Sequence, residues 1–76
     1  MTFEEVVQEL VAAYHTAPDG RRVVMIHLFG IKCGRDILDF NYSVRELCHA
    51  AEVPESYISK IHQGINLSEY VVVRDE

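Results

Sequence analysis

The stretch that begins at Ser43, SVRELCHAAEVPESYISKIHQG, contains two short helical patterns that only a few residues separate. Ser43 and Glu46 have the S-x-x-E spacing of a capping box, which predicts a first helix over residues 44–51. Pro54 is tolerated only near the start of a helix, so the second helix is predicted over residues 54–63. Two helices joined by so short a turn cross steeply and bury their facing stripes together.

The apolar residues of both helices recur at helical spacing. In the first helix the predicted inward stripe is Val44, Leu47, Cys48 and Ala51. In the second helix, Ile58 and Ile61 are predicted to face inward with help from Tyr57. Gly64 is typical of the residue after a helix, where left-handed backbone ends the helix without a steric cost.

Two further helices are predicted upstream. Thr2 and Glu5 form another capping box, and the stripe that follows predicts a helix over residues 3–15. The segment RRVVMIHLFGIKCGR is apolar almost all round, so periodicity alone does not separate a buried helix from a buried strand. Its length and Asp19 as an N-cap favour a helix over residues 20–35. In that helix, Gly30 and Gly34 would allow a neighbouring helix to approach closely.

Together these patterns predict a single all-α domain over residues 1–76, a small helical bundle that contains a helix-turn-helix. Residues 39–43 are predicted to form a turn. The tail INLSEYVVVRDE is left with two interpretations, a short strand at residues 71–73 or a short helix opened by Ser68. A chain of 76 residues buries only about 60% of its unfolded surface, so stability should be modest unless a partner adds to the core.

Composition indicates a cytoplasmic protein. No apolar run reaches the roughly 20 residues that span a bilayer, and the acidic N-terminus does not resemble a secretion signal. Cys33 and Cys48 are the two cysteines, too few for a disulfide framework. The net charge of −5 argues mildly against nucleic acid as a partner, but residues 20–35 carry four of the seven basic side chains and no acid. Such asymmetry can build a basic surface on an acidic protein.

The segment RELCHAAEVPESYISKIHQG resembles the helix-turn-helix of the phage-repressor and Cro-like family. Residues at matching spacing include Leu47, Cys48, Ala51, Val53, Ile58, Ser59, Ile61 and Gly64. The resemblance covers residues 43–64 and is closest in the phrase SYISKI. It implies a repressor-like transcriptional regulator of bacterial or phage type that binds double-stranded DNA, with helix 54–63 in the major groove.

The same resemblance implies roles for individual residues. Base edges would be contacted by the N-terminal part of the second helix, with Gln63 near its far end: Glu55, Ser56, Ser59 and Lys60. Arg45, Arg35 and Asn66 are candidates for holding the phosphate backbone. Because residues 43–64 hold so few cations, one copy should bind weakly. A homodimer with recognition helices about 34 Å apart would double the contacts, and the YVVV tail offers a strand edge for pairing.

The alternative from a different class is a protein-protein interaction module, either an anti-repressor or a subunit of a larger complex, without DNA binding. Glu52, Glu55 and the net charge of −5 favour it. The sequence leaves the operator, the sign of regulation and any effector open.

Metal and catalytic chemistry have little support. Cys33, Cys48, His49 and His62 lack the close C-x-x-C or H-x-x-x-H pairs that anchor a zinc site. No phosphate-binding glycine loop and no defensible nucleophile–base pair is present, and His27 within an apolar run is more often a core histidine than a base. We therefore expect a non-enzyme that needs no cofactor, metal, membrane or small-molecule substrate.

Overall fold

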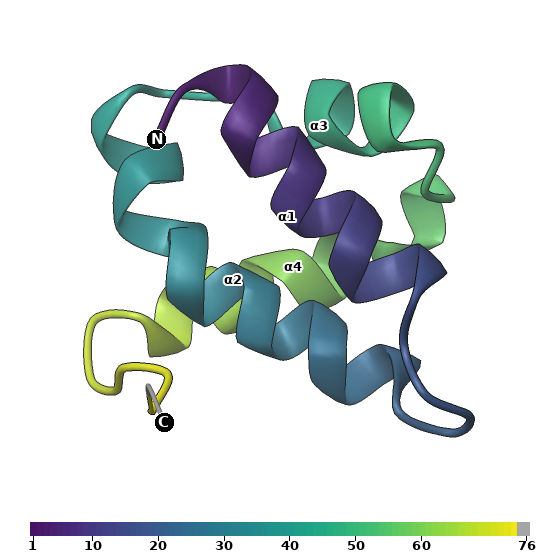
Figure 1. Cartoon of the computed structure of the whole chain (residues 1–76). Coiled ribbons are helices and arrows are strands. Elements are labelled where there is room, and N and C mark those ends of the chain that lie inside the picture. Colours follow the sequence, from purple (N-terminus) through teal and green to yellow (C-terminus); the bar gives the residue numbers. More distant parts are fainter. Residues whose placement is uncertain (75–76) are drawn as a thin grey trace.

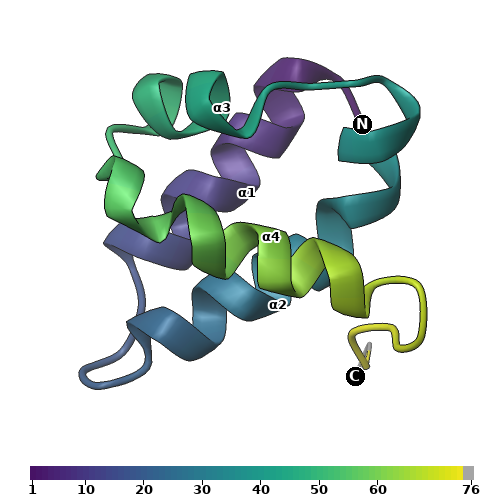
Figure 2. The ribbon, with the colours of Figure 1, turned by 180° about the vertical axis from the view of Figure 1, so that it is seen from behind.

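The computed structural model describes residues 1–74, which form four α-helices, one short 3₁₀ helix and no strand. They are α1 (Phe3–His15), α2 (Arg22–Asp39), α3 (Val44–Ala51), the 3₁₀ helix η1 (Glu55–Tyr57) and α4 (Ile58–Leu67). The predicted all-α bundle is confirmed. Helix α1 contacts both α2 and α3, while α4 packs along α2 (Figure 1), as the view from behind also shows (Figure 2).

The core draws on all four α-helices. Leu10 of α1, Leu47 of α3 and Ile61 of α4 are fully buried, and full burial of such a side chain contributes about 1.5–3 kcal/mol. The predicted inward stripe of α3 is buried as a set: Val44, Leu47, Cys48 and Ala51. Tyr57 and Ile58 are half-buried and pack against this cluster. The apolar stripes therefore fix which face of each helix points inward.

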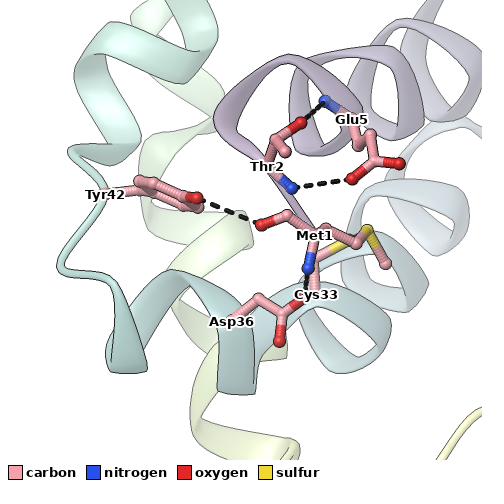
Figure 3. A network of polar contacts seen from close by, with 6 residues as sticks. All are labelled: Met1, Thr2, Glu5, Cys33, Asp36 and Tyr42. Carbon is pink, nitrogen blue, oxygen red and sulfur yellow. Dashed lines mark hydrogen bonds and ion pairs between the residues drawn. The ribbon is translucent and has the colours of Figure 1, made fainter.

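The start of α1 is fixed by the predicted capping box and by contacts to α2 (Figure 3). The Glu5 backbone N–H donates to Thr2 Oγ1 at 3.2 Å, and the Thr2 N–H donates to Glu5 Oε1 at 2.8 Å. The Met1 amino group forms an ion pair with Asp36 Oδ2 at 2.6 Å, and the Tyr42 hydroxyl donates to the Met1 carbonyl at 3.0 Å. This network joins the N-terminus of α1 to α2 and to the α2–α3 loop.

Helix α2 differs from the prediction at both ends. Its N-cap is Arg21, without a side-chain bond, so the assignment of Asp19 as cap was wrong. The helix continues to Asp39, although we predicted an end near residue 35 and a turn from residue 39, because Ile37 extends the buried stripe. Asn41 supplies the stop. It has a φ of 55°, and the Tyr42 N–H donates to the Ile37 carbonyl at 3.0 Å, as in a Schellman motif.

The glycines of α2 lie against the backbone of α4. A Cβ on Gly30 would lie 2.6 Å from the Ile61 carbonyl oxygen and 2.8 Å from Gly64 Cα. A Cβ on Gly34 would reach Ser68 Oγ at 2.5 Å. The predicted close approach of a neighbouring helix is confirmed, and that neighbour is α4.

The prediction that Gly64 ends the second helix was wrong. Gly64 lies inside α4, which continues to Leu67 instead of ending at residue 63. The missing Cβ is needed for contact with α2, since a Cβ there would meet the backbone of His27 and Gly30. Beyond α4, residues 68–70 are turns and residues 71–74 have no regular structure, so neither the strand nor the short helix considered for the tail forms.

Candidate nucleic-acid interface

Helices α3 and α4 form a helix-turn-helix whose turn depends on an unusual backbone conformation. Glu52 ends α3 with φ 57° and ψ 47°, a left-handed conformation that costs an L-residue other than glycine about 1–2 kcal/mol. The Val53 N–H donates to the Cys48 carbonyl at 2.8 Å, and the side chains of both residues are buried. This Schellman closure redirects the chain into η1 and α4.

The outward face of α4 and η1 carries a stripe of uncharged polar side chains. We call this the polar stripe; its members are exposed and spaced three or four residues apart, namely Ser56, Ser59, Gln63 and Asn66. The opposite face of α4 is buried through Ile61, Gly64 and Ile65. Figure 2 shows α4 on the near side of the molecule, with α1 behind it. The polar stripe is therefore accessible to a large partner.

Helix α2 contacts the polar stripe through the His27 side chain. Lys60 is half-buried at the border of the stripe. The His27 ring Nε2 donates to Gln63 Oε1 at 2.9 Å, which links the middle of α2 to the stripe. Because its oxygen is engaged, the Gln63 amide keeps its N–H₂ group as the donor for a further partner. Sequence reasoning placed His27 in the core, but the ring is half-buried and bonded to a predicted site residue.

The structure brings Arg45 and Glu55 together. Arg45 Nη1 lies 3.2 Å from Glu55 Oε1, and His49 Nε2 lies 2.6 Å from Glu55 Oε2. The hydrogen bond from His49, followed by the charge of Arg45, lowers the pKa of Glu55. Sequence reasoning missed His49 as a member of this group, since six residues and a turn separate it from Glu55. The carboxylate of Glu55 is thus partly neutralised at the start of the second helix.

Arg35 lies away from the first turn of α4. It shares a surface depression with Leu38, Asp39, Ser68 and Glu69, where the C-terminal end of α2 meets the end of α4. The predicted site residues at positions 55–66 lie on η1 and α4. Arg45 of α3 contacts Glu55 of η1, and Arg35 lies at the opposite end of α4.

The basic segment of α2 does not form a continuous cationic surface. Arg22 donates to the Tyr14 carbonyl at 3.2 Å, and its guanidinium lies 4.3 Å from the centre of the Tyr14 ring. Lys32 forms an ion pair with Glu9 at 2.8 Å. Half of the four basic side chains in residues 20–35 are therefore engaged with α1. Arg21 and Arg35 remain exposed.

Within residues 1–74, no three histidine, cysteine or acidic side chains are arranged to hold a metal ion. None of the helices in this part of the chain is long and apolar enough to cross a membrane.

Comparison with known proteins identifies the architecture. A family model described as an HTH-like domain matches residues 2–74 of the 76-residue chain. The chain belongs to the HTH-like domain family. The match includes α1 and α2 as well as the helix-turn-helix, and it supports a helix-turn-helix family without favouring the phage-repressor and Cro-like type. Searches of curated proteins and of solved structures found no match to this HTH-like domain.

Proposed function

We propose that this HTH-like domain is a sequence-specific DNA-binding protein that regulates transcription in a repressor-like manner, with the polar stripe of α4 in the major groove. The observation that carries the proposal is the stripe itself: four exposed hydrogen-bonding side chains without a charge, on the second helix of a helix-turn-helix. Helices presented in this way read base edges in double-stranded DNA.

Each member of the stripe has chemistry suited to base recognition. The hydroxyls of Ser56 and Ser59 can donate or accept, so they fit several bases. The Gln63 amide, oriented by His27, donates to an acceptor such as N7 of a purine. Lys60 at the border donates to guanine O6 and N7. Asn66 contacts the phosphate backbone and sets the register, whereas Arg35 lies beyond the far end of α4, beside Glu69, and is left out of the DNA contacts.

The Arg45–Glu55 pair modifies the roles that the resemblance implies. Arg45 neutralises Glu55 and is exposed, so it serves a phosphate while it holds the carboxylate in place. The carboxylate of Glu55 is engaged by Arg45 and His49, so it does not accept a hydrogen bond from cytosine. With so few cations near α4, a single copy binds DNA weakly, and the regulator acts as a homodimer in the cytoplasm.

The deciding experiment is an amide NMR titration with a mixed-sequence duplex, at low salt and then at about fourfold higher salt. Salt-sensitive shifts are expected along the polar stripe and at Arg45. Binding selection then yields a preferred duplex, on which Lys60→Ala should cost about 1–3 kcal/mol and relax sequence preference. Gln8→Ala, at an exposed position of α1, is the matched control. A spectrum that does not change at low salt refutes DNA binding.

A second candidate is a protein-interaction module. The observation that favours it is the pair of exposed acidic side chains that flank Pro54 at the turn, Glu52 and Glu55. A partner with a basic surface would bind this pair, and Glu52→Lys would then abolish capture of the partner. Under the DNA proposal, the same substitution strengthens duplex binding, because it replaces a repulsive charge with an attractive one.

A further inference from the structure

The C-terminal ends of α2 and α4 expose a group of large apolar side chains. We call this group, with the charged residues between its members, the C-terminal face. Tyr70 is 81% exposed and Val72 is 87% exposed, while Leu38, Leu67 and Val71 are each about half exposed. Several exposed apolar side chains in one region mark an interaction surface, whereas single ones are ordinary.

The members of the C-terminal face are neighbours in space. Gly34 of α2 faces Ser68 and Ile65 at the end of α4, which brings the two helix ends together. Leu38 and Glu69 line one depression there, and Arg35 lines both this depression and a second one with Val71 and Val72. Figures 1 and 2 show the tail folding back beside the end of α4. The face is therefore one surface built from two helix ends and the tail.

The charges of the C-terminal face are of both signs and make no ion pair with each other. Within residues 1–74, no ion pair involves Arg35, Asp39 or Glu69. A two-fold symmetric interface brings one patch against a copy of itself, so every cation must meet an anion of the same patch. The C-terminal face satisfies this requirement through Arg35 and Glu69, which carry opposite charges and line the same depression.

We propose that the C-terminal face binds the same face of a second copy and forms an isologous homodimer. Tyr70, Leu38 and Leu67 fill the centre of the interface, and Arg35 of each copy pairs with Glu69 of the other. The partner is a second copy because the patch complements itself in charge. This interface replaces the strand pairing that the sequence suggested for the YVVV tail, because residues 71–74 form no strand.

The relation to DNA recognition rests on the proposed function. A dimer reads two successive major-groove sites on one side of B-DNA when its recognition helices lie about 34 Å apart. Because α4 runs toward the C-terminal face, its first turn and Ser56 would point away from the dyad in each copy.

The test is sedimentation velocity of the whole chain, without DNA, across a wide concentration range. The wild type is expected to show a reversible monomer–dimer equilibrium. Arg35→Glu and Glu69→Arg should each weaken dimerisation roughly tenfold or more, and the double charge swap should restore it. Arg21→Glu, a charge reversal at the exposed start of the same helix, is the matched control and should leave the equilibrium unchanged.

Tyr70→Ser provides a second test, because a residue that is 81% exposed can be replaced without disturbing the fold. It should also weaken the dimer, while circular dichroism and the thermal midpoint stay at wild-type values. A wild type that remains monomeric at the highest NMR concentration overturns the proposal, as does a dimer that is insensitive to both charge reversals.

The two proposals fail separately. A dimer that is disrupted by Arg35→Glu but does not bind any duplex refutes the DNA-binding function and leaves the interface intact. Conversely, stripe-dependent DNA binding by a chain that sediments as a monomer refutes the interface and the homodimer, and leaves recognition of DNA by the polar stripe intact.

Discussion

Replacing Gly64 with alanine has two effects of opposite sign on the free energy of unfolding. Inside an unconstrained helix, alanine is more favourable than glycine by about 1 kcal/mol. In this bundle, the new Cβ would meet the His27 carbonyl oxygen and would lie 2.9 Å from Gly30 Cα. Both neighbours are backbone, so neither can rotate away, and α2 and α4 must move apart.

The magnitude follows from these two contributions. Overpacking typically costs about 1–3 kcal/mol, and contact with rigid backbone on two sides places Gly64→Ala at the upper end. Subtracting the gain in helix propensity leaves a net loss of about 2 kcal/mol. For a chain of 76 residues, whose total stability is about 4–11 kcal/mol, this is a large fraction. The thermal midpoint should fall by about 8–16 °C.

The assay is thermal and urea unfolding followed by circular dichroism, with Asn66→Ala as the control. Asn66 is exposed on the same helix, so alanine there should stabilise the fold by about 0.5 kcal/mol through propensity alone. If Gly64→Ala is neutral or stabilising, the close packing of α2 against α4 is refuted.

Three further predictions concern ionisable side chains. Glu55→Gln should strengthen duplex binding about threefold or more at low salt, because it removes an anion and releases Arg45. Weaker binding of this variant in anisotropy titrations would instead assign Glu55 to base recognition. The pKa values of Glu5 and Glu55 are lowered in the folded chain, by Thr2 and by His49 with Arg45 respectively. Stability from both is therefore present at neutral pH and lost as the pH falls through those lowered pKa values, and urea unfolding at graded pH should show less acid sensitivity for Glu55→Gln. Burial raises the pKa of the Cys33 thiol to about 11, so Cys33 should react with a disulfide reagent at neutral pH only as fast as the chain opens; faster labelling would contradict its burial.

Local sequence patterns predicted helix starts and buried faces correctly where the responsible contacts lie within one helix. The capping boxes predicted at Thr2 and Ser43 mark the starts of α1 and α3, and the Thr2 box forms both of its bonds. The inward stripe of α3 followed directly from apolar spacing. At these positions, the hydrogen bonds and the burial depend on residues within one or two turns, so the sequence contains the whole signal.

The prediction of helix ends failed where contact with a distant element determines where the helix stops. Gly64 resembles a C-cap in sequence, yet its lack of a Cβ is used for contact with Gly30 of α2. Similarly, α2 passes through residue 35 because Ile37 still faces the core, and it stops at Asn41, which tolerates left-handed backbone. Neither cause is local.

The candidate site divides in the same way. Its polar stripe was visible as helical spacing, because outward positions on an amphipathic helix are fixed once the inward ones are known. Its electrostatic pairing was not visible, because Glu55 meets Arg45 and His49 across a turn whose left-handed Glu52 sets the angle between helices. The sequence alone determined three helices with their buried faces and the outward stripe, and it favoured a helix over residues 20–35. Only the tertiary structure decided which charges neutralise each other and which glycines let α2 and α4 touch, since both depend on atoms that lie close in space and far apart along the chain.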